Sequence, residues 1–522
     1  MIKLLKKYYP FLIFLGSIGV FLISFYLIRS FMTNFDEMDH ISAVYLMTQG
    51  QQLYKDIFAT HFPFPFYWAY LFSPLWAHPP FSSAITNLHF SLALFYLLTF
   101  TSIFFSFKKN SFKIMFSVWI LFISSILGLY HGNLYLSEIF TGLMMSSVLW
   151  ILIPVFLDKQ KLNNYTSFLL ILFASIGVWT QPLMIFLLVI PFLLVSSKKE
   201  FFKNVLIAFI INIIPIIALI YSGQFNDFYK QAITFNSVVY SHDFPEKVGN
   251  NTMLMQTVSD FFSHQDVLLT HFFNSTQIYQ FLLNIGLIVF TVAILWKAKL
   301  VHKVSLILLL VALMSRQVKA VPGVIFNFGT FPLLLISFIC LINLFYPNNF
   351  GFKPKFKFIS KSIVTLTIIL CFIFVTKDNW PILKQSLNPA YNYHVFWSNR
   401  EKTGKIINDL TKSNERILVY PNDPDFYFFS QRLPMDRFTY WYPWYDKIPE
   451  YKQERLNALK NNPPSLIYSG GLGYKSDPYL YAKFFPELLV NYVRVADQGI
   501  PTDIWLRKDL KDRIQGSYSI QK

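Results

Sequence analysis

Long apolar runs recur along the chain up to about residue 376. Most are roughly 17–25 residues long, and a helix of that length crosses about 30 Å of hydrocarbon. The predicted spans lie near 9–30, 85–107, 114–130, 138–157, 165–178, 183–195, 204–221, 280–296, 304–314, 323–346 and 362–376. The pattern therefore predicts a polytopic α-helical membrane protein with about eleven transmembrane helices, some of them short.

Two stretches between the spans are long enough to carry structure of their own. In the first, residues 31–83, Ile41–Met47 has helical spacing, and Asp39 or Ser42 is positioned to cap that helix. The second, residues 222–279, is aromatic and polar. We expect it to form helices that lie on the membrane surface.

The composition changes after Asp378 to that of a water-exposed domain. Short apolar runs typical of strands lie at 417–420, 465–468, 493–495 and 504–506, and helix-like stretches lie near 401–412, 446–460 and 478–490. Alternating strands and helices predict a compact α/β domain. We therefore divide the chain into a transmembrane domain, residues 1–376, and an α/β domain, residues 377–522.

The charge distribution predicts which side of the membrane each loop faces. The chain is 54% hydrophobic and carries a formal charge of +17, which by itself suggests a polyanionic partner such as nucleic acid. However, 18 basic residues fall in one set of loops and only five in the opposite, longer set. By the positive-inside rule the N-terminus is cytoplasmic, and both the 31–83 loop and the C-terminal domain are extracytoplasmic. We expect a multi-pass protein of the cell membrane with no nucleic-acid partner.

An acidic cluster follows the first span, which we expect to be a retained helix and not a cleaved signal. Asp36, Glu37 and Asp39, with His40, lie together in a chain that has only 28 acids among 522 residues. Acids at a membrane boundary are costly to place there and are candidates for function. The alternatives are helix capping, simple solvation, or binding of Mg²⁺ or Mn²⁺ by the hard carboxylates.

Several cationic and acidic side chains on the same predicted side accompany this cluster. Lys55 and His61 precede a proline-aromatic stretch, Glu138 lies at the mouth of the fourth span, and Arg316 and Lys319 lie where basic residues are otherwise scarce. An arginine fork and a lysine ammonium suit phosphate. Alternatively, the stretch after His61 is an aromatic belt at the membrane surface, Glu138 caps its helix, and Arg316 and Lys319 anchor the chain to lipid headgroups.

In their order along the chain, these motifs resemble the GT-C superfamily of integral-membrane glycosyltransferases. The resemblance is to the branch of the protein O-mannosyltransferases and the aminoarabinose transferase that acts on lipid A. It is carried by Asp36-Glu37, Gly50 to Asp56, His61-x-Pro63, Arg316 before Phe328–Pro332, Tyr427–Pro434 with Arg437-Phe438, and Asn462–Tyr468. The chain departs from the related enzymes at His61-Phe62-Pro63, where they tend to have Lys-Pro-Pro.

The resemblance implies a GT-C-like catalytic domain over residues 1–376 and transfer of a sugar from a polyprenyl-phosphate donor to an envelope glycan, lipid or protein. It implies Asp36 as the base and Glu37 as its orienting partner, with inversion at the anomeric carbon. Arg316, Lys319, His61 and Lys55 would bind the donor phosphate, and Glu138, Asp39, Arg432 and Arg437 are candidates for acceptor or sugar contacts. The resemblance implies no required cofactor, and Mg²⁺ or Mn²⁺ is the less favoured expectation.

Two other classes of function are consistent with the same membrane pattern. One is a transporter or flippase of lipid-linked saccharides without covalent chemistry, and the other is a non-catalytic scaffold for wall assembly. Transporters often show internal repeats and binding sites near the membrane midplane. We find no such repeat, and the polar residues cluster at the predicted outer face. These observations favour the transferase.

Overall fold

The structure, a computed structural model, describes most of residues 2–240, residues 299–317, and most of residues 384–520. The largest stretches outside this description are 241–298, 318–383 and 470–489. Three predicted spans, at 280–296, 323–346 and 362–376, lie outside the described residues, as does the predicted helix at 478–490.

The chain forms two compact units that are each discontinuous in sequence. Unit 1 comprises residues 1–31, 89–215 and 249–389, and unit 2 comprises residues 32–88, 216–248 and 390–522. The first outer loop therefore belongs to the same compact unit as the C-terminal region. The sequence places that loop between two spans, so only long-range packing reveals this grouping.

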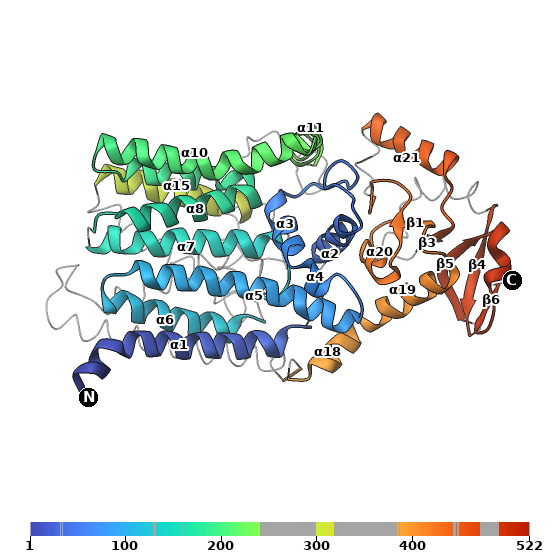
Figure 1. The fold of residues 1–522 in the computed structure, drawn as a ribbon, viewed down its shortest axis with the longest axis horizontal. Helices are drawn as coiled ribbons and strands as arrows, with labels where there is room; N and C mark the ends of the chain where they lie inside the picture. Colours follow the sequence, from blue (N-terminus) through green and yellow to red (C-terminus); the bar gives the residue numbers. More distant parts are fainter. Residues whose placement is uncertain are drawn as a thin grey trace, which may run out of the picture. The chain divides into compact units, whose positions relative to one another are not determined.

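The described part of unit 1 is a bundle of helices lying side by side (Figure 1). In it α1 packs on α6, α7 on α8, and α15 on α9. Its helices are α1 (Ile2–Ile28), α5 (Phe81–Ser106, which begins in unit 2), α6 (Asn110–Ile126), α7 (Ser137–Asp158), α8 (Asn164–Thr180), the short 3-10 turn η1 (Pro182–Met184), α9 (Ile185–Leu193), α10 (Lys198–Tyr221) and α15 (Leu300–Gln317).

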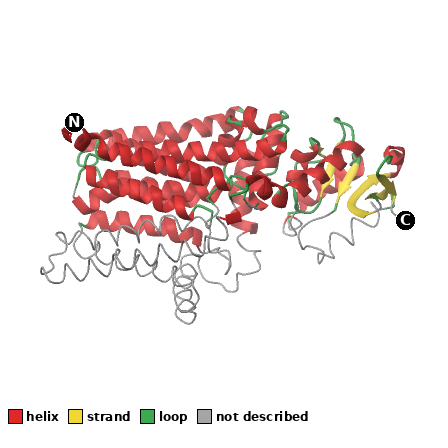
Figure 2. Cartoon of the chain, turned by 90° about the horizontal axis from the view of Figure 1, so that it is seen from below, coloured by secondary structure: helices red, strands yellow, loops and turns green. Residues whose placement is uncertain are grey.

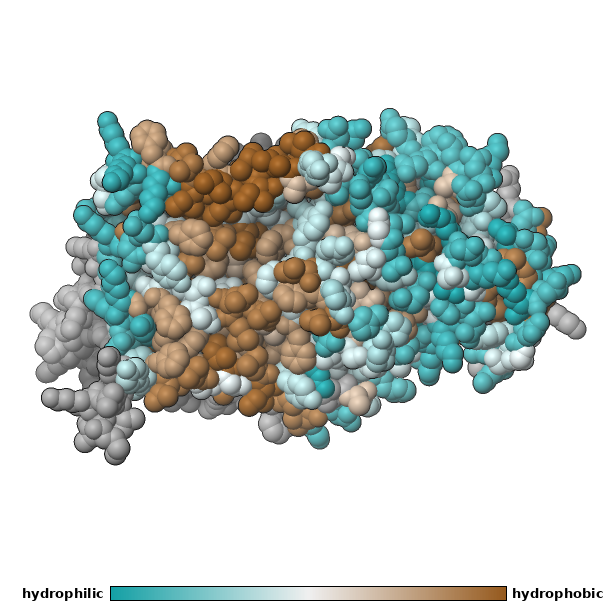
Figure 3. Space-filling model, viewed as in Figure 1, coloured by the Kyte–Doolittle hydropathy of each residue, from teal (hydrophilic) through white to brown (hydrophobic). Residues whose placement is uncertain are grey.

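Four of the described helices are long and apolar enough to cross a membrane: Tyr8–Ile28, Phe81–Ser106, Ser137–Phe156 and Lys198–Tyr221. The third is 94% buried over its apolar window and the fourth only 11%, so α7 is an inner helix and α10 an outer one. Figure 3 shows the exposed apolar side chains of α10 as a brown surface. Such a surface suits lipid and not water. The count of eleven spans stays a prediction.

The first outer loop of unit 2 begins with a helix that is longer than the sequence pattern predicts. The helices of this loop are α2 (Phe35–Thr48), α3 (Pro63–Leu71) and α4 (Ser73–Trp76). The prediction that Asp39 or Ser42 caps a helix at Ile41–Met47 is wrong, because both lie inside α2. Asp36 and Glu37 occupy the first turn, where the helix dipole favours negative charge, and this extends the helix upstream.

The described part of the second outer stretch consists of α11 (Phe225–Phe228) and a π-helix, η2 (Tyr229–Tyr240). Side-chain amides of η2 fasten the first outer loop. Gln231 accepts a hydrogen bond from the Ala59 amide at 3.0 Å and donates to the Tyr54 carbonyl, and Asn236 donates to the Thr60 carbonyl at 2.7 Å. These bonds satisfy backbone amide and carbonyl groups of the loop, which have no partner in a helix or a strand.

The C-terminal region folds around a six-stranded sheet of order β2-β1-β3-β5-β4-β6, and Figure 2 shows the strands confined to this region. β1 pairs in parallel with β2 and β3, and the other pairs are antiparallel. The strands are β1 (Arg416–Val419), β2 (Leu433–Pro434), β3 (Leu466–Tyr468), β4 (Tyr492–Asp497), β5 (Ile500–Arg507) and β6 (Tyr518–Ile520). The helices are α18 (Pro389–Phe396), α19 (Ser398–Leu410), α20 (Asp425–Ser430), α21 (Pro449–Asn461) and the 3-10 turn η5 (Lys508–Arg513).

Four of these strands overlap the four predicted apolar runs, and α19 and α21 overlap two predicted helices. β2, β6 and α20 are not foreseen. β2 has only two residues, and β6 is partly exposed, so neither shows an apolar run of its own. All six residues of α20 are buried, so it has no polar face that would reveal helical periodicity.

One phenylalanine of the first outer loop lies inside the aromatic core of the C-terminal region. Phe58 is only 1% exposed. Its ring centroid lies 5.2 Å from Phe438, 4.9 Å from Tyr445 and 5.2 Å from Tyr451. Its backbone amide donates to the Arg437 carbonyl at 2.8 Å. The loop and the C-terminal region therefore share one core.

We expect Phe58→Ala to destabilise unit 2 by about 3–5 kcal/mol, because it removes a buried ring from a packed core. Thermal unfolding of the full chain in lipid nanodiscs, followed by proteolysis of the C-terminal region, measures this loss. Phe209→Ala is the matched control, since Phe209 on α10 is 60% exposed. Equal effects of the two substitutions would contradict a shared core.

Candidate active site

The acidic cluster lies on the first turns of α2, which packs against α3, α4 and α20. Glu37 is fully buried, and Asp39 and His40 are 2% and 1% exposed. Asp36 alone among them is partly exposed. Asp36 is therefore the member of the cluster that an incoming molecule can reach in unit 2.

His40 fixes the backbone at Asp36. Its Nδ1 lies 2.7 Å from the Asp36 carbonyl, and since a carbonyl only accepts, Nδ1 carries the proton. The ring stacks on Phe66 at 4.6 Å and lies 5.5 Å from the His61 ring. Burial, followed by the neighbouring His61, lowers the pKa of His40 to about 4. His40 is therefore neutral near pH 7 and acts as a hydrogen-bond donor to the main chain.

Asp39 is buried without a hydrogen-bond partner for either carboxylate oxygen among the described residues. Ser42 Oγ, one turn further along α2, is in the same condition. Burial, and then the charge of Asp36, raises the pKa of Asp39 well above its usual range. Burial therefore favours the protonated, neutral form of Asp39.

Two tyrosines complete the surroundings of Asp39. Tyr54 donates its hydroxyl to the His61 carbonyl at 2.8 Å. Tyr440, from the C-terminal region, is hydrogen-bonded to Tyr445 and Thr60. Burial first raises the pKa of both tyrosines, and the charge of Asp39 raises it further.

The contribution of Tyr440 is the part of this site that sequence reasoning misses. The Tyr440–Trp444 run stands out in the sequence only as an aromatic stretch suited to sugar stacking. Tyr440 lies 401 positions after Asp39, and no local pattern reports such a separation. Residues 442–444 of that run lie outside the described residues.

The predicted phosphate-binding cations come from both units of the chain, and not all of them are described. Lys55 is exposed on a turn, and His61 is half-buried beside His40. Arg316 lies near the end of α15 in unit 1, whereas the acidic cluster belongs to unit 2. Lys319 lies outside the described residues. The role of this set stays a prediction.

Glu138 lies in the first turn of α7 in unit 1 and is 9% exposed. A carboxylate at this position interacts favourably with the positive end of the helix dipole, which is compatible with either a capping or a binding role. Nearby Asn133 is fully buried and donates to the carbonyls of Ile28 and Phe31 at 3.0 and 2.9 Å. Asn133 thus closes the C-terminal end of α1, just before the acidic cluster in the sequence.

Arg432, predicted to contact the acceptor or the sugar, has hydrogen-bond partners within unit 2, and the predicted contact stays a prediction. Its side chain is buried and donates to Thr411 Oγ1 at 2.8 Å and to the carbonyls of Asn408, Thr411, Ser430 and Gln431. The guanidinium therefore serves to join the ends of α19 and α20. Its signal in the sequence, a basic residue within a family-like motif, does not distinguish a structural arginine from a binding one.

Arg437 also has partners within unit 2. It lies 2.8 Å from Glu454 on α21 and 3.7 Å from Asp227 on α11. The guanidinium is also 5.4 Å from the centre of the Tyr451 ring. These contacts place Arg437 between the two outer segments and the C-terminal core, where it joins them. The predicted substrate contact stays a prediction.

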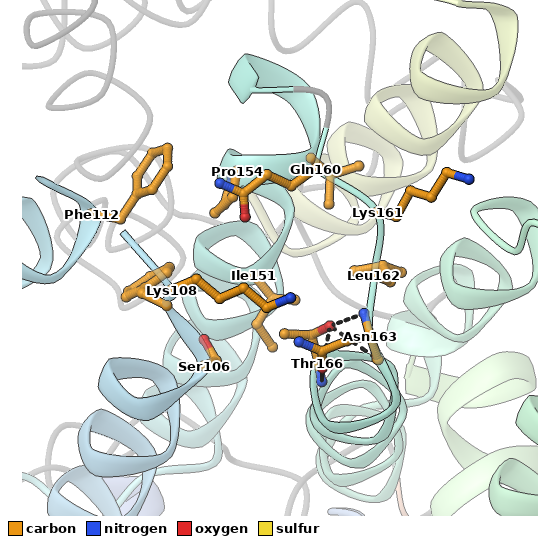
Figure 4. Close-up of a pocket in the computed structure, with 12 residues that line it drawn as sticks. Ser106, Lys108, Phe112, Ile151, Pro154, Gln160, Lys161, Leu162, Asn163 and Thr166 are labelled. Atoms are coloured by element: carbon orange, nitrogen blue, oxygen red, sulfur yellow. Dashed lines mark hydrogen bonds between the residues drawn. The ribbon is translucent and has the colours of Figure 1, made fainter. Parts of the chain in front are cut away.

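None of the residues that line a pocket in unit 1 is a predicted site residue (Figure 4). It is formed by the α5–α6 turn, the end of α7 and the start of α8. Its lysines, Lys108 and Lys161, are exposed, and Asn163 and Thr166 satisfy each other in a capping box at 2.8 and 2.9 Å. The polar groups that line this pocket thus serve to start α8.

The described residues contain no group of three or more His, Cys, Asp or Glu side chains arranged to hold a metal ion. The two-histidine pair of His40 and His61 is bounded by Phe66 and by the Asp36 carbonyl. The expectation that no cofactor is required stays a prediction.

Comparison with solved structures identifies the fold, although no protein-family model and no curated protein sequence matches the chain. The apo crystal structure of ArnT from Cupriavidus metallidurans matches with a TM-score of 0.52 and 10% identity, over 96% of this chain and 98% of ArnT. The same ArnT bound to undecaprenyl phosphate gives 0.52 and 11%, over 95% and 97%. The Archaeoglobus fulgidus oligosaccharyltransferase tethered to an acceptor peptide gives 0.51 and 10%, over 99% and 76%.

Both neighbours are membrane glycosyltransferases of the GT-C superfamily. The chain has the GT-C fold. At about 10% identity the likeness establishes the architecture and not the substrates. Within the GT-C fold of this chain, the Asp36-Glu37 pair begins the first helix after α1, as the sequence motif requires.

The neutral state of His40 predicts a pH dependence of stability. Because the folded-state pKa is about 4 and the ordinary value is 6.5, the stabilisation is complete above pH 6.5 and is lost as the pH falls towards 4. The loss amounts to up to about 3 kcal/mol. His40→Phe keeps the stacking on Phe66 and should flatten this part of the pH profile.

Unfolding temperatures of the wild type and His40→Phe, measured from pH 4.5 to 7.5, test this prediction. Asp39 acts in the opposite direction, since its raised pKa adds stability as the pH falls, but it is present in both proteins. The difference between the two curves therefore isolates His40. A difference that does not change with pH would mean that the imidazole is not held neutral.

Proposed function

We propose that the protein is a glycosyltransferase that moves a sugar from a polyprenyl-phosphate donor to an extracytoplasmic acceptor. The observation that carries this proposal is a GT-C fold over 96% of the chain, with the reachable Asp36 on the first turn after α1. The ArnT neighbour has been crystallised with undecaprenyl phosphate and the oligosaccharyltransferase with an acceptor peptide, which supports a lipid-phosphate donor.

In the proposed reaction a hydroxyl oxygen of the acceptor attacks the anomeric carbon of the donor sugar. The bond from that carbon to the phosphate oxygen breaks, and its electron pair stays on the phosphate. The proton of the attacking hydroxyl passes to the carboxylate of Asp36, which acts as general base. One displacement with one base inverts the anomeric carbon. The leaving phosphate is already ionised, so no general acid is needed.

Within unit 2, the supports of Asp36 are consistent with a general base. The hydrogen bond from His40 fixes its main chain, and Glu37, fully buried at the next position, is proposed to orient it or the acceptor. Asp36 keeps partial exposure, so a substrate hydroxyl can approach. A base held within about 3 Å of the proton it removes is the geometric requirement for this role.

The donor phosphate is proposed to be bound by Arg316, Lys319, His61 and Lys55. Cations aimed at the bridging oxygen stabilise the charge that develops there as the bond breaks. Glu138 is proposed to contact the acceptor or the sugar from the start of α7. We propose no required metal, and any Mg²⁺ or Mn²⁺ would use the α2 carboxylates.

The distribution of lysines supports an orientation with the N-terminus in the cytoplasm and the C-terminal region outside. In that orientation the acidic cluster and Tyr440 both face the extracytoplasmic compartment. An envelope glycan, lipid or protein is then the accessible acceptor. The four long apolar helices support a location in the cell membrane.

We expect Asp36→Asn to lower the rate of transfer by about 10²–10⁴-fold, because it removes the base and keeps the shape of the side chain. The assay follows release of radiolabelled sugar from undecaprenyl-phosphate hexoses and pentoses by the full chain in nanodiscs. Asp56→Asn is the matched control, since Asp56 is exposed on the same loop and only accepts a hydrogen bond from the Gln52 amide. Full activity of Asp36→Asn would exclude Asp36 as the base.

A further inference from the structure

Two buried aspartates of unit 2 differ sharply in their surroundings. Asp425 is fully buried and is held by Arg400, whose Nη1 lies 2.7 and 2.8 Å from its two oxygens. Asp39 is 2% exposed, and no hydrogen bond reaches either oxygen from the described residues. The partner of Asp425 explains its burial. Nothing in the described fold explains that of Asp39.

An unpartnered polar group in a protein interior is expensive. Leaving a buried donor or acceptor unsatisfied costs about 1–3 kcal/mol, and a charged group costs more. Buried polar atoms without partners are rare in native proteins, and those that persist often serve a function. Ser42 Oγ adds a second unpartnered group on the same helix. A pair of such groups, three residues apart and on one helix face, indicates a site for a polar ligand group.

The location of Asp39 narrows the choice of ligand. Asp39 follows Asp36 by three residues, so the two side chains lie on the same face of α2. Asp39 also lies close enough to Tyr54 and Tyr440, from two other segments, for its charge to raise the pKa of both hydroxyls. Along α2 from Asp36, Asp39 therefore lies about one turn further on and Ser42 about two turns further on.

We propose that Asp39 and Ser42 bind a hydroxyl group of the sugar whose transfer Asp36 catalyses. The proposal deepens the proposed function and rests on it. Asp39 donates its acid proton to the sugar oxygen or accepts the sugar hydroxyl proton on its second oxygen, and Ser42 supplies the complementary bond. Asp39 is thus a specificity residue, and Asp36 remains the base.

The charge state of Asp39 favours a neutral hydroxyl over an ammonium group. Burial raises the pKa of Asp39 and so favours its protonated form, and a protonated carboxyl is both donor and acceptor. A sugar hydroxyl has the same dual character. A cationic amino group would instead require Asp39 to lose its proton, and the test below includes that case.

The first test compares the stability of two matched variants of the full chain in nanodiscs without substrate. Asp39→Leu should leave the unfolding temperature unchanged or raise it, because it removes an unsatisfied polar group. Asp425→Leu should lower it, because it removes one of the two carboxylates that hold Arg400 and leaves Asp423 as the other. Asp39→Asn checks that the result does not depend on the larger leucine. A decrease for Asp39→Leu and Asp39→Asn as large as that for Asp425→Leu would overturn the proposal.

The second test uses undecaprenyl-phosphate glucose, mannose and galactose, their monodeoxy forms, and an amino-sugar analogue. The wild type should discriminate against one deoxy form by about 10²-fold or more in kcat/KM. Asp39→Leu should reduce that ratio to about threefold while slowing the parent sugar. Equal slowing of every sugar would contradict a specificity role, and so would a preference of the wild type for the amino sugar.

Separate assays locate the hydroxyl and keep the two proposals distinct. In the first assay the donor is hydrolysed without acceptor, and slower hydrolysis of a deoxy donor assigns the hydroxyl to the donor sugar. In the second assay the acceptor is varied, and slower transfer only to deoxy acceptors assigns the hydroxyl to the acceptor. If the wild type transfers none of these sugars, the proposed function fails. The stability comparison then still decides whether Asp39 is a structural acid or is held for a ligand.

Discussion

The insertion of Phe58 into the aromatic core of the C-terminal region is the contact on which the candidate site depends. Together with the amide bonds from Gln231 and Asn236, it fixes the loop between α2 and α3. Because that loop is fixed, His61 lies beside His40, and Thr60 lies within hydrogen-bonding reach of Tyr440. Apolar packing at one end of the loop thus sets the polar geometry at the other.

The favourable free energy of this packing offsets the cost of burying the ionisable side chains at the start of α2. Burial of Glu37, Asp39 and His40 in one helix carries a desolvation cost that a purely structural helix would avoid. Proteins accept such costs where a site must be ready before its ligand arrives. The contrast with Asp425, which is equally buried but paired with Arg400, shows that this fold satisfies its structural acids.

The sequence predicts those parts of the fold that follow from local patterns. Apolar length predicts α1, α5, α7 and α10 as spans, and short apolar runs predict β1, β3, β4 and β5. For the acids after α1 it predicts a site, and that role stays a prediction. It fails where the decisive contact is distant: the burial of Arg432, the position of Tyr440 beside Asp39, and the grouping of the first loop with the C-terminal region. Hydrophobic periodicity predicts that a residue is buried, but it does not predict which distant residue packs against it.

The pairing of Phe58 with Phe438 also constrains how the chain is made. The two residues are 380 positions apart, so the ribosome completes the outer loop long before the residues that enclose it. Contacts of such high sequence separation form late and leave apolar surface exposed in the meantime. The first outer loop therefore cannot complete its aromatic core until the C-terminal region has been synthesised, so folding of unit 2 depends on completion of the chain's C-terminal region.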